Sequence, residues 1–293
     1  MTQYYSPLSL LPEGISTGVT PRELKIAKHA LLAEFELTGS TTIQAAGSQL
    51  TRNDVLKLFD KLEHSNDLEY HALVATDIVL LHFLLHHEIK PGQNFSLSHS
   101  QCDEAFIAWI SPFFAFAFRK ATLRIFRTVN RLEFDTLVVN PKLMTEQDEW
   151  QAWTAVELHL QDVAQKFDNV LHAQYPAQAL IEKYTHYALI TLLCNLPQAR
   201  FSEILNDYAF ALMQLSITEY NKGQKTRAFE LIAFAKSIAV NDTLQRQVAD
   251  KETEMLKLQK SEKSAKNKET FWTVFKVTLF VLYALTRIAS CAD

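Results

Sequence analysis

The chain has 293 residues, 48% of them hydrophobic and 21% charged, a composition that excludes a disordered protein. Its formal net charge of −4 lacks the basic balance that nucleic-acid-binding domains carry, so no nucleic-acid partner is predicted. The three cysteines lie far apart and form no CxxC pair, which argues against a disulfide framework and for a reducing compartment.

Glycine usage indicates a mainly α-helical fold. The chain has six glycines, and none lies between Gly92 and Gly223. A β-rich protein of this size needs many tight turns, which favour glycine, whereas abundant Ala, Leu, Lys, Glu and Gln favour helices. The first residues lack the basic start and apolar run of a secretory signal, so we expect the bulk of the chain in the cytoplasm.

A small N-terminal helical module is predicted over residues 1–90. Thr20 and Glu23 have the spacing of a capping box ahead of an apolar periodicity, which predicts the first helix. The β-branched residues within 39–51 predict a small β-hairpin. We expect two more helices after it, the longer one spanning about residues 67–88.

Beyond this module the sequence predicts a helical array or bundle over residues 101–245. The segment 90–101, KPGQNFSLSHSQ, combines Pro, Gly, Asn and serines and is the clearest internal boundary. After it we expect a helix over 103–132 that Pro112 kinks or splits. The apolar run within that helix is too short to cross a membrane and is interpreted as core.

Residues 209–242 combine small and apolar residues at helical spacing around a glycine. The positions that carry this pattern are Leu212, Leu215, Ser216, Gly223, Ala228 and Ala235. The pattern resembles a single tetratricopeptide repeat, a pair of antiparallel helices whose small residues allow close packing. Val240 and Glu219 depart from the family pattern, which commonly has a proline and an aromatic residue there. A degenerate stack of helical repeats and an unrelated bundle with one similar hairpin are both compatible with the sequence.

Three histidines are candidate metal ligands. His71, His82 and His86 are spaced so that they would line one side of the helix predicted over 67–88. Two imidazoles one turn apart can chelate a transition metal. No carboxylate occupies the HExxH position, and a partly exposed face of an amphipathic helix is the competing interpretation. We therefore predict no bound metal and no other cofactor.

A basic stripe is predicted from Lys120, Arg124, Arg127 and Arg131, which follow one another at spacings of four, three and four residues. Such a stripe could bind phosphates, anionic lipid headgroups or an acidic partner peptide. The alternative is a solvated face whose cations pair with the acidic residues of the next long helix.

No catalytic motif is present in the sequence. It contains no GxSxG, no phosphate-binding loop and no dinucleotide fingerprint. We predict a non-enzymatic protein and assign no catalytic or cofactor-binding residue.

The end of the chain predicts a charged helical stalk over 246–270 and an apolar helix over 271–292. The apolar helix would be about 33 Å long, enough to cross a hydrocarbon core of about 30 Å. Lysines concentrate on its upstream side, which predicts a C-terminal membrane anchor with the bulk of the chain in the cytoplasm. The membrane-flanking residues are Lys263, Lys266, Lys268, Trp272, Lys276 and Arg287.

A second interpretation of this helix stays open. Lys276 and Arg287 are eleven residues apart and therefore share one side of the helix. Such a polar stripe also suits a helix that packs on a soluble core or lies in the membrane interface.

The function predicted from these features is that of a membrane-tethered helical scaffold that binds a protein partner on the cytoplasmic side. One alternative is a soluble helical regulatory protein in the cytoplasm that uses 271–292 for packing or homo-oligomerisation. The other is a metal-binding enzyme or sensor built on the three histidines.

Overall fold

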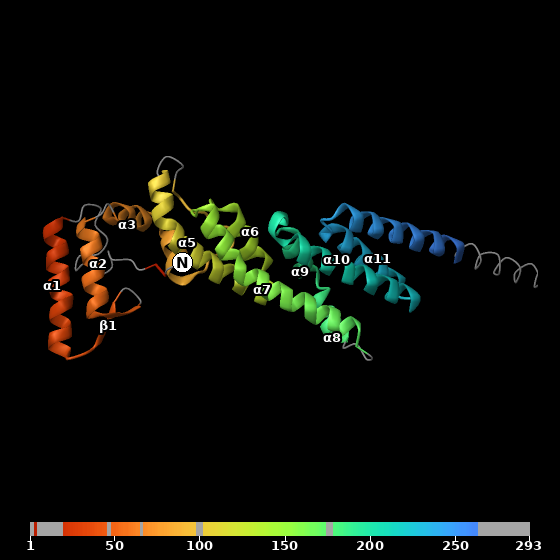
Figure 1. The fold of residues 1–293 in the computed structure, drawn as a ribbon, viewed down its shortest axis with the longest axis horizontal. Helices are drawn as coiled ribbons and strands as arrows, with labels where there is room; N and C mark the ends of the chain where they lie inside the picture. Colours follow the sequence, from red (N-terminus) through yellow and green to blue (C-terminus); the bar gives the residue numbers. More distant parts are fainter. Residues whose placement is uncertain are drawn as a thin grey trace, which may run out of the picture. The chain divides into compact units, whose positions relative to one another are not determined.

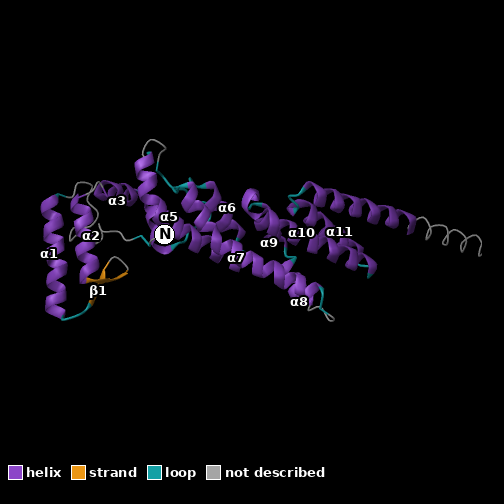
Figure 2. Ribbon diagram, viewed as in Figure 1, coloured by secondary structure: helices purple, strands orange, loops and turns teal. Residues whose placement is uncertain are grey.

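The computed structural model describes residues 3–4, 20–45, 48–64, 67–97, 102–173 and 178–262 of the chain. Within these ranges the chain is mainly α-helical, with one two-stranded sheet (Figures 1 and 2). The predicted fold class is confirmed at this level. The predicted apolar helix over 271–292 lies outside the described residues, as does the stalk beyond residue 262.

The N-terminal module folds around its own apolar cluster. Its elements are α1 (Pro21–Thr38), β1 (Thr42–Ala45), β2 (Ser48–Thr51) and α2 (Arg52–His64). The predicted capping box is present, because the Glu23 amide donates to Thr20 Oγ1 and the Thr20 amide donates to Glu23 Oε2. The strands form the predicted hairpin, with Ile43 opposite Leu50, and both side chains are buried against α1 and α2.

Asp77 interrupts the helix predicted over residues 67–88. α3 (Asp67–Thr76) ends before it, and α4 (Ile78–His86) begins after it at an angle of 106°. The Asp77 carboxylate is buried and accepts the Leu80 amide at 2.9 Å, so it caps α4. The prediction of one continuous helix is wrong because this cap lies inside an otherwise apolar run.

The helix predicted over 103–132 is two helices, divided after Thr128 and not at Pro112. α5 (Glu104–Thr128) continues through Pro112. It ends at Val129, whose φ of 54° is left-handed and cannot continue the helix. α6 (Arg131–Val139) then begins with Asn130 as its N-cap.

The segment 90–97 is fixed to the helices by two buried side chains. Asp77 accepts the Ser96 amide at 2.5 Å, and Asn140 accepts the Phe95 amide at 2.6 Å. The Phe95 ring is itself buried in the core. This segment of turn-forming residues is therefore held against the helices, and we call residues 90–97 the strap.

The chain separates into two compact units. Unit 1 comprises Met1–Val163 and His186–Leu192, and unit 2 comprises Ala164–Thr185 and Leu193–Asp293. The helices that follow α6 are α7 (Glu146–Leu171), α8 (Gln178–Tyr184), α9 (Tyr187–Cys194), α10 (Gln198–Asn221) and α11 (Lys225–Ile238). The first boundary between units falls inside α7, so the segment 90–101 lies within unit 1 and does not separate two units.

In unit 2, α10 and α11 form a helical hairpin. The chain turns at Gly223, whose φ of 84° is a conformation that glycine adopts without strain. The small residues Ser216, Ala228 and Ala235 are fully buried in this hairpin. A helix pair and a glycine turn are thus present where the tetratricopeptide-like pattern lies.

A further helix over residues 242–262 runs back along α11. Lys236 pairs with Glu252 at 2.8 Å, and Lys225 pairs with Glu262. Because the earlier lysine pairs with the later glutamate, the two helices are antiparallel.

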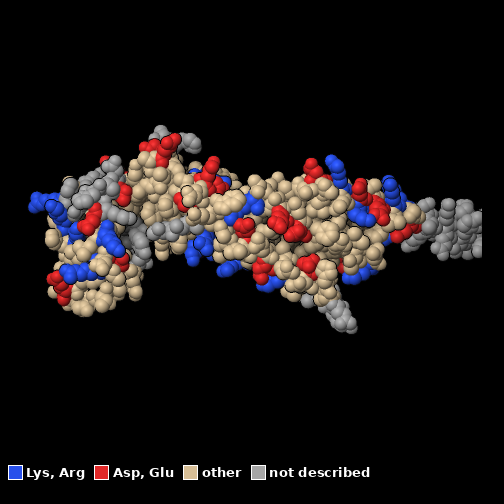
Figure 3. Space-filling model, viewed as in Figure 1, with Lys and Arg blue, Asp and Glu red and all other residues tan. Residues whose placement is uncertain are grey.

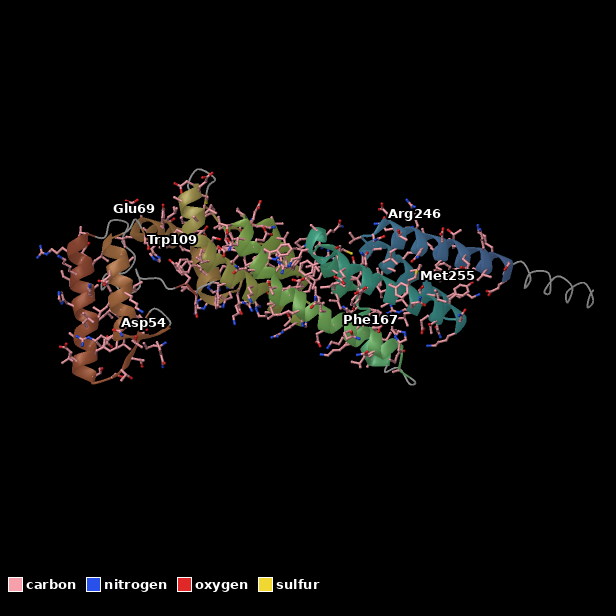
Figure 4. All side chains as sticks on the ribbon, in the orientation of Figure 1. Asp54, Glu69, Trp109, Phe167, Arg246 and Met255 are labelled. Carbon is pink, nitrogen blue, oxygen red and sulfur yellow. The ribbon has the colours of Figure 1, made fainter. Side chains whose placement is uncertain are left out.

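This helix is a packed part of unit 2. Leu244, Val248 and Met255 are buried, and Met255 (Figure 4) packs against Tyr220. The sequence predicts a charged stalk from residue 246, whereas the structure packs the described part of that stretch on α11. Most charged side chains of this stretch lie on the exposed side of the helix. The high fraction of charged residues therefore gives no sign that the other side is apolar.

Candidate functional site

Unit 1 contains a cavity of about 640 Å³ between the N-terminal module and helices α3 and α5. Its apolar lining residues are Leu50, Leu58, Leu62, Trp109, Pro112 and Phe113. Its polar lining residues are Gln3, Gln49, Asp54, Lys57, Asp67 and His71. Figure 4 labels Asp54 at the start of α2 and Trp109 on α5, which contribute to different walls. A cavity of this size, with apolar walls and a few polar groups, has the properties of a binding site.

His71 is the buried polar group of this cavity. Its side chain is 7% exposed, and the Tyr4 hydroxyl lies 2.9 Å from its Nδ1. The Trp109 ring stands perpendicular to the imidazole, with 4.7 Å between the ring centroids. Burial lowers the pKa of His71 to about 3. The ring is therefore neutral at physiological pH and offers hydrogen bonding without charge.

Tyr4 packs against the aromatic residues that line the cavity next to His71. Its side chain is 1% exposed, and its ring meets those of Trp109 and Phe113 edge-on, with centroid distances of 6.5 and 5.6 Å. Aromatic pairs prefer this edge-to-face geometry. Three rings that line the cavity, from α3 and α5, therefore pack against the buried Tyr4 ring.

Asp54 has a structural role at the start of α2. Its carboxylate accepts hydrogen bonds from the Thr51 hydroxyl and the Thr51 amide, and these bonds lower its pKa. Together with Thr51 it caps the start of α2. This carboxylate adds negative charge to the cavity but has little capacity left to act as a base.

Sequence reasoning did not find this cavity. Its walls come from residues far apart in the chain, such as Leu50, His71 and Trp109. Neither a motif nor a spacing rule connects them, because only the packing of the N-terminal module on α3 and α5 brings them together.

The three candidate metal ligands do not share one helix face. His71 lies on α3, whereas His82 and His86 lie on α4, beyond the 106° bend. The rings of His82 and His86 are neighbours, with 4.6 Å between their centroids. In the part of the chain that the structure describes, no group of three His, Cys, Asp or Glu side chains could hold a metal ion.

The predicted basic stripe is divided between two helices. Arg131 belongs to α6 and pairs there with Asp135 at 3.3 Å. Arg124 forms a two-pronged ion pair with the buried Glu133 and lies 3.8 Å from Glu88. Its partners are not the acidic residues of the next long helix, which the alternative interpretation of the stripe named.

The other two cations of the stripe, Lys120 and Arg127, are exposed on α5. Figure 3 shows one face of the molecule, on which Lys and Arg side chains are interspersed with Asp and Glu. Among the described residues no ion pair reaches either Lys120 or Arg127.

The residues predicted to flank a membrane, from Lys263 to Arg287, lie outside the described residues. Within the described ranges, α5 is long and apolar enough to cross a membrane, and half of its most apolar window is buried in the fold. α3 and α4 reach the same threshold only when the bent pair is counted as one span. Because α5 buries Phe114 and Phe118 in unit 1, its composition fits a core helix.

Comparisons of the chain with family models, with curated proteins and with solved structures find no match.

Proposed function

We propose that the protein is a membrane-tethered helical scaffold that binds a protein partner through the cavity of unit 1. The observation that carries this proposal is the cavity itself, which is lined by apolar side chains and by the exposed charged residues Asp54 and Lys57. Protein interfaces have this arrangement, in which an apolar anchor is buried at the centre and a polar rim surrounds it. The neutral His71 supplies a hydrogen bond within the apolar part, which favours an anchor side chain that is uncharged.

The tether is proposed from the sequence of 271–292 and from the end of unit 2. The packed helix extends to residue 262, so eight residues, 263–270, connect it to the apolar segment. A chain of this length spans at most about 28 Å when fully extended. A span at 271–292 would therefore hold unit 2 close to the membrane surface.

Membrane fractionation tests the tether. The full chain is expected in the membrane pellet after carbonate washing, and a version that ends at Glu269 is expected in the supernatant. Recovery of the full chain in the supernatant would remove the tether and favour the soluble regulatory alternative, in which 271–292 packs or oligomerises.

A cavity-filling substitution tests partner binding. Leu58 lines the cavity, so Leu58→Trp adds bulk where the partner's anchor would enter. Leu37 is 87% exposed on α1, outside the cavity, and Leu37→Trp is the matched control. Proteins crosslinked to each variant in cells are compared by quantitative mass spectrometry, after thermal denaturation has shown that both variants fold. We expect a protein that Leu58→Trp loses and Leu37→Trp keeps, and identical sets for the two variants would refute the proposed site.

A further inference from the structure

One side of α5 presents cations and apolar side chains together. We call the residues at 116, 119, 120, 123 and 127 the α5 basic face, because their spacing places them on one side of the helix. Arg119, Lys120 and Arg127 are exposed, and Phe116 and Leu123 are half-buried. The opposite side of α5 carries the buried core residues of unit 1.

Within the described ranges, the three cations of this face have no carboxylate partner. Among the described residues no ion pair reaches Arg119, Lys120 or Arg127, although salt bridges are frequent elsewhere in the chain. The Lys120 ammonium lies 5.6 Å from the centroid of the Phe116 ring, so this cation rests on an aromatic surface. Arg124, one residue outside the face, is by contrast held by the buried Glu133.

His87, directly after α4, lies close enough to the face for its pKa to respond to the Lys120 charge. Burial of the His87 ring lowers its pKa, and the nearby Lys120 and His86 lower it further. Arg124 acts in the same direction, and Glu88 acts in the opposite one. His87 therefore lies in a region where cations outweigh carboxylates.

Cations interspersed with an aromatic and an aliphatic side chain match the chemistry of a lipid surface. Anionic headgroups attract Lys and Arg, and Phe and Leu gain from burial at the boundary of headgroups and acyl chains. We propose that the α5 basic face binds the anionic phospholipid headgroups of the membrane to which the chain is tethered. This inference rests on the proposed tether for the presence of a membrane, and it gives unit 1 its own contact with that membrane.

A fluorophore on the α5 basic face tests the contact in the full chain. Leu123→Cys carries nitrobenzoxadiazole, and Cys102, Cys194 and Cys291 are replaced by serine. The chain is reconstituted into phosphatidylcholine vesicles with or without roughly 30% phosphatidylserine. We expect brighter emission at shorter wavelength only with phosphatidylserine, and loss of this change in about 0.5 M salt. The same fluorophore at Leu37→Cys, on α1, is expected to remain water-exposed in every case.

Charge removal provides the matched variants. The triple variant Arg119→Gln, Lys120→Gln and Arg127→Gln is expected to lose the response to phosphatidylserine. The control variant removes three exposed cations of the N-terminal module, Arg22, Lys25 and Arg52, and is expected to keep it.

Flotation of the same vesicles separates the two proposals. A chain that floats with both vesicle types while residue 123 stays water-exposed keeps its tether and overturns the inference. A chain that floats only with phosphatidylserine overturns the tether and supports the inference, and a chain that floats with neither overturns both. Salt-sensitive binding to polyglutamate without any lipid response would assign the face to an acidic protein partner and also overturn the inference.

Discussion

His71 is a titratable side chain that the fold of unit 1 keeps neutral. Its pKa is about 3 in the folded protein, because the ring is buried beside Tyr4 and Trp109, whereas an unfolded chain has the ordinary value of about 6.5. Between these two values the unfolded chain binds a proton that the folded chain excludes. The stability contributed by His71 is therefore complete above about pH 6.5 and falls as the pH is lowered towards 3.

A pH series measures this linkage. At pH 5 the wild type is expected to lose about 2 kcal/mol of its free energy of unfolding through His71, relative to pH 7.5. Glutamine does not titrate, so the free energy of unfolding of His71→Gln is expected to fall by about 2 kcal/mol less than that of the wild type over the same pH change. Chemical denaturation at both pH values gives the comparison, and the other histidines cancel because both proteins contain them. Equal losses for the two proteins would show that His71 titrates normally.

Val129 is a β-branched residue in a left-handed conformation. Its φ is 54° at the end of α5, where the helix must stop before α6 begins. The left-handed region costs an L-residue with a side chain about 1–2 kcal/mol, whereas glycine enters it freely. The left-handed conformation of Val129 turns the chain between α5 and α6, and the packing of the two helices offsets its cost.

A glycine at this position is expected to stabilise the protein. Val129→Gly should raise the free energy of unfolding by about 1 kcal/mol, since relief of strain exceeds the loss of a half-buried side chain. Thr128→Gly, at the last residue of the helix, should lower it by about 0.5 kcal/mol, because glycine has a lower helix propensity than threonine. Thermal denaturation of both variants checks the pair, and the same sign for both would contradict the argument.

At the scale of elements, two buried side chains hold the strap of residues 90–97 on the helices of unit 1. Asp77 serves two elements at once, because it caps α4 through the Leu80 amide and accepts the Ser96 amide of the strap. Asn140 holds the next part of the strap through the Phe95 amide. Loss of either side chain would leave buried amides without acceptors.

Asp77→Ala is expected to lower the free energy of unfolding by about 3 kcal/mol, because the buried Leu80 amide and the partly buried Ser96 and Leu97 amides lose their acceptor together. Asp103→Ala is the matched control, since the exposed Asp103 caps α5 through the Phe106 amide alone. Its loss should cost about 1 kcal/mol. Urea denaturation of the two variants compares a buried cap that joins two elements with an exposed cap. Similar costs for both would mean that the strap contributes little.

The elements that sequence predicts correctly are those whose causes are local. Thr20 and Glu23 are three residues apart, so the capping box of α1 is visible in the sequence, and so is the hairpin that follows. The break at Asp77 depends in part on the amide of Ser96, nineteen residues later, and no local pattern reports it. Arg124 likewise pairs with a buried carboxylate on the next helix. Residue spacing does not report this pair, so the sequence groups Arg124 with the exposed cations of the basic stripe.

At the scale of the whole molecule, the sequence predicts helices but not which of them pack together. The 242–262 stretch is rich in charge, yet Leu244, Val248 and Met255, at spacings of four and seven residues, share one side of the helix and are buried. The cavity of unit 1 is a product of packing in the same way. Fold class follows from composition and periodicity, whereas sites between elements require the coordinates of several distant segments.

Packing of the 242–262 helix can be measured with two substitutions. Met255 is 4% exposed and Leu258 is 47% exposed. Met255→Ala should lower the free energy of unfolding by about 2–3 kcal/mol through the cavity it leaves. Leu258→Ala should change it by no more than about 0.5 kcal/mol. If Met255→Ala were as mild as Leu258→Ala in chemical denaturation, this stretch would be the unpacked stalk that its charge suggests.

The strap also has a practical consequence for anyone who engineers this chain. Its run of proline, glycine, asparagine and serine would attract a designer in search of a place for an affinity tag, a protease site or a split point. An insertion between Gly92 and Phe95 would instead pull a buried ring and its amide away from Asn140. The glycine turn at residue 223, which is exposed and joins two helices that are adjacent in sequence, is the better place to cut or extend the polypeptide.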